Sequence, residues 1–167
     1  MRIEITKGKA EDFIRVTRED GTIAETRFPK KGPFPHDLVH AVVEDELGFR
    51  SAFWGMIAGG RHPEEIGALA ASLGHASAAK AHDPDPSIIE LIQAERLVEC
   101  FEAEIWGGPA ALEDLQAVAD AAFSASRVPR VVLAPEKVTA IRERLAAFGR
   151  DWNGLPISGT LRCDWAT

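Results

Sequence analysis

This sequence is poor in cysteine, in long apolar runs and in positive charge, and each shortage excludes a class of protein. Its 167 residues include only two cysteines, Cys100 and Cys163, which lie far apart and in no C-x-x-C pattern. The chain is long enough to bury a core without disulfide staples. A single structural disulfide stays open, but two small buried side chains in a reduced protein are the favoured interpretation.

No segment has the length or composition of a membrane anchor or a leader. The longest weakly polar run, SAFWGMIAGG at 51–60, is about half as long as a bilayer-spanning helix. The N-terminal MRIEITKGK alternates charged with apolar residues and lacks the continuous apolar core of a signal peptide. We therefore expect a cytoplasmic protein that does not enter membranes.

Positive charge is scarce and scattered. Nineteen Lys and Arg residues stand against 26 Asp and Glu residues, giving a net charge of −7. Because a negative surface repels phosphate, we expect neither nucleic acid nor an anionic membrane as partner. The sequence also contains no G-x-G-x-x-G loop and no G-x-S-x-G elbow, so neither a dinucleotide site nor a serine-hydrolase nucleophile is predicted.

The remaining composition is that of a folded globular protein, with 46% apolar and 27% charged residues. Without an internal repeat or a low-complexity linker, the chain is predicted to form a single domain over 1–167. Alternating apolar residues predict strands at both ends of the chain. The predicted strands are 2–8, 12–20, 22–28 and 159–166. Asp20-Gly21 supplies the positive φ that a tight hairpin needs between two of them.

The middle of the chain is predicted to be helical. The expected helices are 36–47, 51–60, 63–74, 87–106, 109–126 and 134–152. Ser51 is a possible N-cap of the second, and proline stands at the start of several others. The fold class is therefore α+β, with a small antiparallel sheet (N-terminal hairpin plus C-terminal strand) packed against a mostly helical middle.

Burial can be predicted for both parts. In the sheet we expect one buried face, made by Ile3, Ile5, Ile14, Val16, Leu161, Cys163 and Trp165. In the longest helix we expect burial of Leu91, Val98, Phe101 and Ile105, with Glu90 and Glu104 in solvent. The aromatic group Phe49, Phe53 and Trp54 is expected in the core or at a dimer interface.

The segment HDLVHAVVEDEL at 36–47 is the best candidate for chemistry. It places His36 and His40 four residues apart, so on a helix they lie about 40° from each other on one face. The apolar residues fill the adjoining face, which predicts both imidazoles at the rim of the buried surface and Glu44 and Asp37 just outside it.

Two imidazoles at this spacing can each point one nitrogen at a single divalent metal ion, zinc being the first candidate. The pattern H-D-x-x-H resembles the H-E-x-x-H helix of zinc peptidases, in which the glutamate is the general base. Asp37 holds that position here and is the candidate catalytic base, although its side chain is one methylene shorter.

A third metal ligand is expected from another helix. Glu95, Glu99 and Glu102 form a carboxylate stripe on the longest helix. Glu95 follows Leu91 and Ile92 by one turn, so it is expected to be the most shielded of the three and the third ligand. The predicted metal ligands are thus His36, His40 and Glu95.

The run at 20–60 also resembles a family of uncharacterised bacterial proteins with an N-terminal hairpin followed by a PHDLxHxxVExxLG…FWG helix. The matching residues are His36, Asp37, Leu38, His40, Val43, Glu44, Leu47, Gly48, Phe53 and Gly55, and AERLV at 94–98 is similar to a later helix of that family. The resemblance implies a bacterial cytoplasmic protein and carries no activity with it.

Two functions stay open at this point. One is a metal-binding protein, hydrolytic if Asp37 acts as a base; the other is a non-enzymatic binding or assembly module whose histidines are structural. A homo-oligomer is possible in either case, and the sequence names no substrate. His82, Asp83 and Asp85 in HDPDP can approach a cation, but a polar proline-rich turn is the favoured interpretation.

Overall fold

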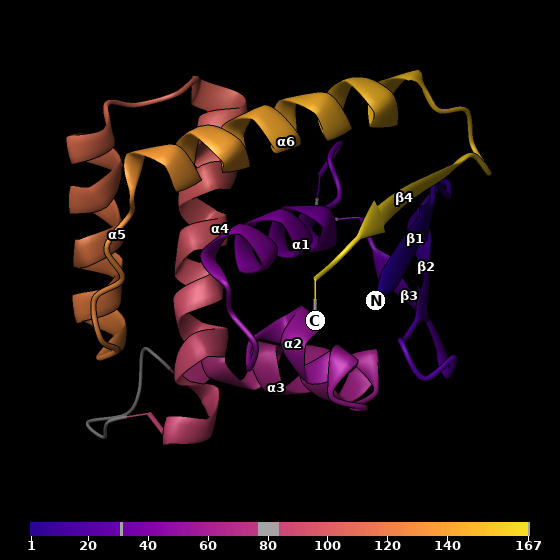
Figure 1. Cartoon of the computed structure of the whole chain (residues 1–167), viewed down its shortest axis with the longest axis horizontal. Coiled ribbons are helices and arrows are strands. Elements are labelled where there is room, and N and C mark those ends of the chain that lie inside the picture. The colour runs from indigo at the N-terminus through magenta and orange to yellow at the C-terminus, as the bar shows by residue number, and fades with distance from the viewer. Residues whose placement is uncertain (31, 77–83, 167) are drawn as a thin grey trace.

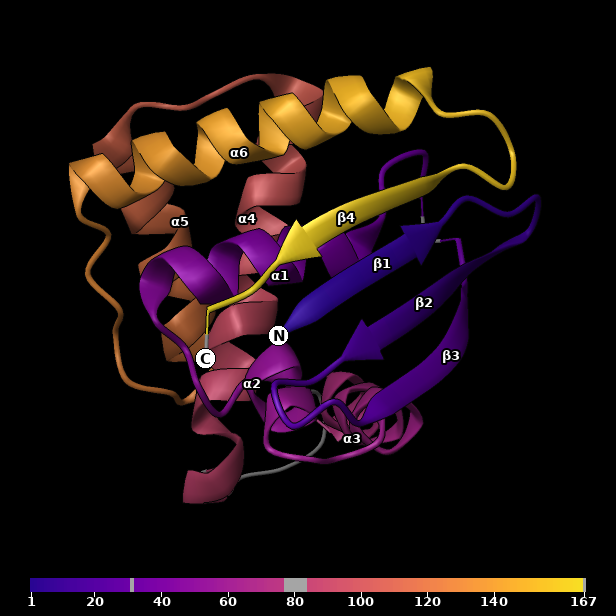
Figure 2. The same cartoon turned by 45° about the vertical axis from the view of Figure 1, so that its right-hand side comes forward.

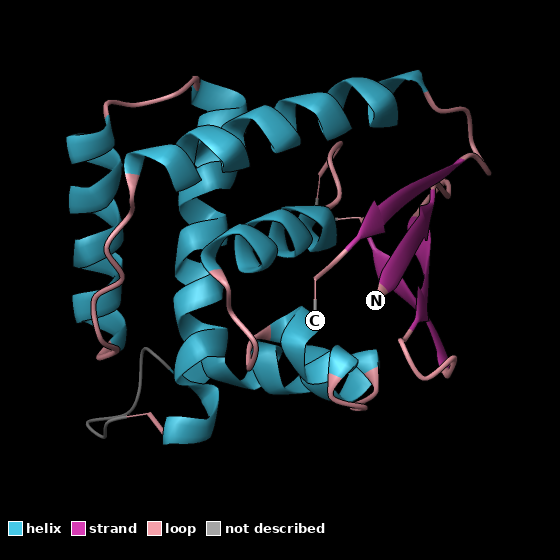
Figure 3. Cartoon of the chain, viewed as in Figure 1, coloured by secondary structure: helices cyan, strands magenta, loops and turns pink. Residues whose placement is uncertain are grey.

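The computed structural model describes residues 1–30, 32–76 and 84–166, without the side chains of 70–76. Its elements follow the chain in the order β1 (Arg2–Thr6), β2 (Glu11–Thr17), β3 (Ile23–Pro29), α1 (His36–Leu47), α2 (Phe53–Ala58), α3 (Pro63–Ala76), a 3₁₀ turn (Pro86–Ile88), α4 (Ile89–Gly107), α5 (Leu112–Ser126), α6 (Pro135–Gly154) and β4 (Thr160–Asp164). The sheet lies at one side of the molecule and the helices at the other (Figure 3).

The four strands form one antiparallel sheet in the order β3-β2-β1-β4. Gly21, in the β2–β3 turn, has φ +81°, the conformation expected of the Asp20-Gly21 pair. The last strand returns to pair with the first, with Ile5 opposite Leu161 and Ile3 opposite Cys163. Both ends of the described chain therefore meet at this edge of the sheet (Figure 2).

The period-two pattern predicts the buried face of the sheet correctly. All seven predicted residues are buried: Ile3, Ile5, Ile14, Val16, Leu161, Cys163 and Trp165. They join side chains from α1 and α2 in a cluster that we call the sheet-side core, which also contains Trp54, Ile57 and Trp152. The α+β architecture predicted from the sequence is confirmed.

A second apolar cluster, the helical core, fills the space between α1, α4, α5 and α6. Phe101 and Leu97 of α4 and Phe123 of α5 are among its largest members. α1 lies between the two cores, because Leu38 packs in the sheet-side core whereas Val39 packs in the helical core. Figure 1 shows α1 in this central position, with the sheet on one side and α4 on the other.

The sequence predicted correctly that these helices exist, but it placed their ends less accurately. Ser51 does not cap α2: its N-cap is Ala52, and the Ser51 N–H instead donates to the Glu90 carboxylate. α5 begins at Leu112, three residues after the proline that was expected to open it. At α2 a tertiary contact replaces the expected cap, and at α5 the preceding loop is longer than expected.

The predicted buried face of the longest helix is wrong at the C-terminal end of that helix. Phe101 is buried as predicted, but Ile105 is 40% exposed. Glu104 turns away from bulk solvent and accepts two hydrogen bonds from the Arg142 guanidinium of α6. α6 thus covers the face that was predicted polar, and Arg142 supplies the charge that makes covering Glu104 tolerable.

Two further expectations can be compared with the fold. Cys100 and Cys163 are both free and buried, so they form no disulfide with each other. Phe49, Phe53 and Trp54 are all buried within the chain and belong to its cores.

Within the described residues, none of the helices combines the length and the apolar character needed to cross a bilayer.

Candidate metal centre

α1 positions the two histidines at its first and second turns. The helix begins directly after Pro35, which is in an extended conformation, and ends at Gly48, whose φ of 72° is left-handed. Every residue from Leu38 to Glu44 is buried, although only some of them are apolar. The middle of α1 is therefore enclosed on all sides rather than lying at the surface of a core.

The two imidazole rings lie together, as their spacing predicts. Their centroids are 4.8 Å apart and the ring planes meet at 73°. The His36 side chain keeps 12% of its surface in solvent, whereas that of His40 keeps 3%. One imidazole is thus at the edge of the site and the other is inside it.

The Nε2 atoms of both rings face the same carboxylate on α4. Glu95 Oε2 lies 3.9 Å from His36 Nε2, and Glu95 Oε1 lies 3.5 Å from His40 Nε2. The Glu95 side chain is 23% exposed, against 51% for Glu99 and 32% for Glu102. Glu95 is therefore the most shielded member of the stripe, as predicted, and it faces both imidazoles.

The Nδ1 atoms are held by two further carboxylates. His36 Nδ1 is 2.8 Å from Glu102 Oε1, and His40 Nδ1 is 3.1 Å from Glu44 Oε1. An acidic partner at Nδ1 fixes the orientation of an imidazole and makes its other nitrogen a better metal ligand. Each histidine thus has one nitrogen anchored and the other directed at Glu95.

Glu44 is the most enclosed of these carboxylates, with a side chain that has no exposed surface. Its second oxygen, Oε2, accepts the backbone N–H of Trp54 at 2.8 Å and, more weakly, that of Gly55 at 3.4 Å. These are free N–H groups in the first turn of α2, so Glu44 replaces the missing side-chain cap of that helix. One carboxylate therefore connects α2 to the His40 ring.

Gly55 makes this close approach possible. A Cβ at that position would fall 2.2 Å from the backbone oxygen of Arg50, a separation that real Cβ atoms do not show. Any side chain there would push the start of α2 away from the preceding loop and from Glu44.

The expected rim position holds for His36 but needs correction for His40, as does the expected position of Glu44 outside the buried face. His40 is 2% exposed and Glu44 is fully buried, so neither lies outside the apolar face. The reason is tertiary: a helical projection treats one face as buried, but α1 is packed by the sheet-side core and the helical core together. Polar residues on its remaining face are then covered by α4 and α2.

Burial and the neighbouring charges have opposite effects on the pKa values of the buried pair His40 and Glu44. Burial alone would lower the pKa of His40, but the hydrogen bonds and charges of Glu44 and Glu95 outweigh it and raise that pKa to about 10. Burial also raises the pKa of Glu44, against the effect of its bond with His40. The His40–Glu44 pair therefore holds a proton at neutral pH.

The geometry of the ligand atoms fits a divalent metal after small side-chain adjustments. The ligand atoms of His36, His40 and Glu95 all lie within 4.8 Å of one another. Zinc bonds of about 2.0–2.1 Å at tetrahedral angles require separations of about 3.4 Å. With Glu44 and Glu102 included, three carboxylates surround two imidazoles, so the ionised group has an excess negative charge that a cation offsets.

Asp37, the predicted catalytic base, lies beside this group but is not one of the three residues that converge. Its side chain is half-buried in the first turn of α1. Its backbone carbonyl accepts the Trp54 indole N–H at 2.9 Å, which ties the start of α1 to α2. A catalytic role for Asp37 stays a prediction.

Sequence reasoning missed the roles of Glu44 and Glu102. Glu44 follows His40 by four residues, and Glu102 follows Glu95 by seven, so both spacings place the carboxylate on the face of its neighbour. Those spacings were the available signal. What they could not supply was the inter-helix distance that brings Glu102 to His36.

Among the residues that the structure describes, the other polar groups considered from the sequence do not converge on this site. His62 accepts the Glu64 N–H at the start of α3, at 3.4 Å. Asp85 is the N-cap of the 3₁₀ turn, and its carboxylate accepts hydrogen bonds from the N–H and the hydroxyl of Ser87. His82 and Asp83, the other members of the HDPDP pattern, lie outside the described residues.

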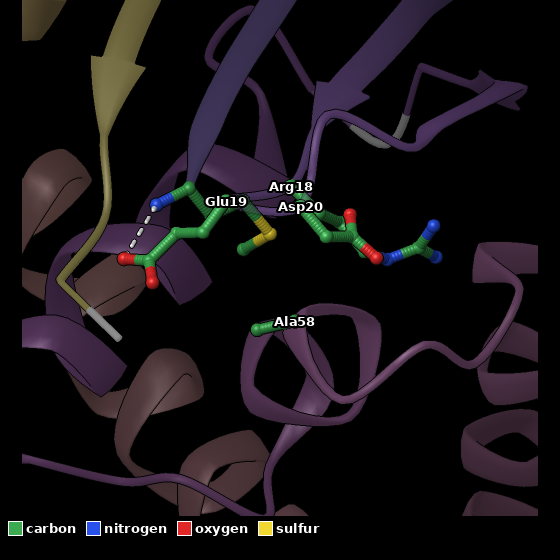
Figure 4. A pocket seen from close by; sticks show the side chains of 5 residues that line it. Arg18, Glu19, Asp20 and Ala58 are labelled. Carbon is green, nitrogen blue, oxygen red and sulfur yellow. Dashed lines mark ion pairs between the residues drawn. The ribbon is translucent and has the colours of Figure 1, made fainter.

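A separate hollow of about 270 Å³ lies at the β2–β3 turn, lined by Met1, Arg18, Glu19, Asp20 and Ala58 (Figure 4). Its charged groups are engaged locally. Glu19 lies 3.9 Å from the amino group of Met1, and Arg18 donates to the carbonyls of Ile57 and Arg61. Its residues position α2 against the sheet and share no member with the histidine group.

Comparison of the chain with protein-family models, with curated proteins and with solved structures found no significant match.

Proposed function

We propose that this protein binds a divalent transition metal through His36 Nε2, His40 Nε2 and one oxygen of Glu95. The observation that supports this most is the double anchoring: both Nδ1 atoms have a carboxylate partner, and both Nε2 atoms face the same third carboxylate. Two histidines and one carboxylate are the ligand set of several catalytic zinc and non-haem iron centres. Zinc is the first ion to test.

Three protein ligands leave coordination positions for water or a substrate. Closed structural zinc sites use four protein ligands, so this set favours an open centre. When bound, the metal would lower the pKa of a coordinated water. The protein residues would orient the imidazoles through Glu44 and Glu102, and Asp37 is the candidate to accept a proton in a hydrolytic reaction.

The alternative function is a non-enzymatic module in which the same residues form a structural network. The observation favouring it is that His40 is already paired with Glu44 and Glu95, which raise its pKa to about 10. In that case the protonated His40 imidazole, and no metal, offsets the negative charge of Glu44 and Glu95.

Other expectations from the sequence stay part of this proposal. The net charge of −7 supports partners other than nucleic acid and anionic membrane. The two free, buried cysteines support a reducing, cytoplasmic location. The likeness of 20–60 to a bacterial family with the same helix pattern supports the same setting.

Metal binding can be tested by titrating zinc into chelator-treated protein and counting bound ions. We expect about one equivalent per chain, with His36→Ala and Glu95→Gln each weakening affinity by at least about 100-fold. His62→Ala and Glu99→Gln are matched controls, since they remove a histidine and a stripe carboxylate that are not ligands. Folded protein that takes up no zinc, or equal binding by all four variants, would reject the metal function in favour of the structural network.

A further inference from the structure

The strand β3 forms one edge of the sheet and carries backbone groups that no other strand uses. The order β3-β2-β1-β4 gives β3 a neighbouring strand on one side only (Figure 2). The Lys30 N–H donates to the Ala10 carbonyl at 3.1 Å and continues the β2–β3 ladder, so the even-numbered residues of β3 bond to β2. Ile23, Glu25 and Arg27 therefore direct their N–H and C=O groups outward, and no hydrogen bond among the described residues engages these groups. Such an edge is a template for a further strand.

The exposed side chains of β3 are complementary to those of a second, antiparallel β3. Glu25 and Arg27 both lie on the exposed face of the sheet, with one residue between them. When two copies of β3 pair about Thr26, each Glu25 lies opposite the Arg27 of the other copy, and outward backbone groups meet outward backbone groups. Pairing about Glu25 or about Arg27 instead places like charges opposite each other, which destabilises a strand pair.

Thr26, at the centre of this pairing, has a side-chain hydroxyl without a partner. The residue is 4% exposed, and its Oγ1 makes no hydrogen bond within the described chain. In this register Thr26 faces its own counterpart as a non-hydrogen-bonded pair, in which the two Cα atoms are about 4.5 Å apart. Two threonines at that separation can hydrogen-bond through their hydroxyls. Because a buried hydroxyl without a partner costs free energy, the pairing removes a cost that the single chain carries.

We infer that β3 is the interface at which two copies of this chain pair, with a two-fold axis at Thr26 that joins their sheets into one. Glu25 and Arg27 exchange backbone hydrogen bonds across the axis, and the interface is the same patch on both copies. The Ile23 N–H donates to the Pro29 carbonyl of the second copy. Because proline has no N–H, the ladder ends there. Ile23 is 50% exposed in the single chain and gains an apolar neighbour in the Pro29 ring.

The contacts that these charges make within the chain leave them accessible. Glu25 Oε1 lies 3.5 Å from Arg15 Nη1, and the two side chains are 48% and 45% exposed. The guanidinium carbon of Arg27 lies 5.9 Å from the centroid of the Phe13 ring, and Arg27 is an exposed residue. Both charged groups therefore have free surface for a second copy. None of these residues belongs to the histidine group, so the inference is independent of the metal function.

Charge reversal and charge exchange test the pairing. Sedimentation velocity at increasing protein concentration should show a dimer for the wild type. Arg27→Glu sets like charges opposite each other at two symmetric places and should raise the dimer dissociation constant by at least about tenfold. Glu25→Arg combined with Arg27→Glu restores opposite charges and should restore the dimer. Arg162→Glu is the matched control, because Arg162 is an exposed arginine on β4, at the opposite edge of the sheet.

Cross-linking tests the register. Oxidised Thr26→Cys should give a disulfide-linked dimer on a non-reducing gel, because a Cα separation of about 4.5 Å suits a disulfide. Ala24→Cys is the matched control: Ala24 is 6% exposed on the same face of β3, but it would lie about 14 Å along the strand from its counterpart. The wild type, whose Cys100 and Cys163 are buried, gives the background.

Three results would overturn the inference: a wild type that stays monomeric, a dimer that persists in Arg27→Glu, or equal cross-linking of the two cysteine variants. Circular dichroism of each variant shows whether it is folded. If Arg27→Glu is folded and monomeric but the charge exchange does not restore the dimer, the pairing of Glu25 with Arg27 is wrong.

Discussion

The sheet-side core and the α1–α4 interface are both buried, but they are held together by different forces. In the sheet-side core, Ile5, Ile14 and Leu161 stack across neighbouring strands with apolar contacts alone. At the α1–α4 interface, apolar packing is interrupted by two imidazoles and the carboxylates of Glu44, Glu95 and Glu102.

Apolar burial stabilises a fold in proportion to the area removed from water, whereas a buried polar group stabilises it only when its partners are in place. A set of five buried or half-buried ionisable groups is therefore an unusual way to join two helices. Five measurements test the contrast between the two regions.

The largest effect is expected from emptying an aromatic site in the helical core. Phe101→Ala should lower the free energy of unfolding by about 3–5 kcal/mol, because Phe101 is 1% exposed and leaves a cavity. Urea denaturation measures the loss, which should be the same with zinc or with chelator. A loss under about 1 kcal/mol would mean that α4 packs in a different phase.

Breaking the polar network at its most buried member should cost about 3 kcal/mol. Glu44→Ala leaves His40 and the first turn of α2 without their shared acceptor. Unlike Phe101→Ala, this change should also weaken zinc binding. Glu99→Ala, on the exposed part of the stripe, is the control and should change stability by no more than about 0.5 kcal/mol. Equal, small losses in both variants would contradict a buried network.

Zinc should stabilise the protein increasingly as pH rises. Zinc at 100 times its dissociation constant adds about 2.7 kcal/mol. The folded pKa of His40, about 10, is above its ordinary value of 6.5, so without metal the protonated pair contributes stability below about pH 6.5 that is lost as pH rises toward 10. Metal requires the neutral ring, so its contribution changes in the opposite direction.

Melting temperatures with zinc and with chelator, taken at about pH 6 and pH 8, measure this difference. The gap between the two curves should widen at the higher pH. A gap that is absent at both values supports the structural network instead.

A smaller change in the sheet should be insensitive to metal. Ile14→Val removes one methyl group from a site that is 1% exposed and should lower the free energy of unfolding by about 1 kcal/mol. Denaturation with and without zinc should give the same loss, since the strand shares no ligand with the histidine group. A zinc-dependent loss would show that the two regions are coupled.

The smallest effect is expected at the end of α4. Ile105 is 40% exposed, so Ile105→Ala should change stability by no more than about 0.5 kcal/mol. The sequence-based helix phase placed Ile105 in the core and would give several times that loss. The same denaturation measurement therefore decides between the two phases.

The sequence by itself was sufficient for the sheet and for identifying His36, His40 and Glu95 as residues that come together. Period-two alternation in the strands and the i, i+4 spacing of His36 and His40 are local, and local geometry places such side chains on one face. The greater shielding of Glu95 than of Glu99 and Glu102 was also a local signal, because Glu95 follows the apolar turn of Leu91 and Ile92.

Only the tertiary structure decided how these pieces combine. A helical projection has one buried face, but α1 is packed between two cores, so His40 and Glu44 became buried where a rim was expected. The pairing of His36 with Glu102, residues 66 apart, depends on how α4 crosses α1. The exposure of Ile105 depends likewise on Arg142 of α6 drawing Glu104 inward. Distances between elements far apart in sequence are set by packing, and no local pattern encodes them.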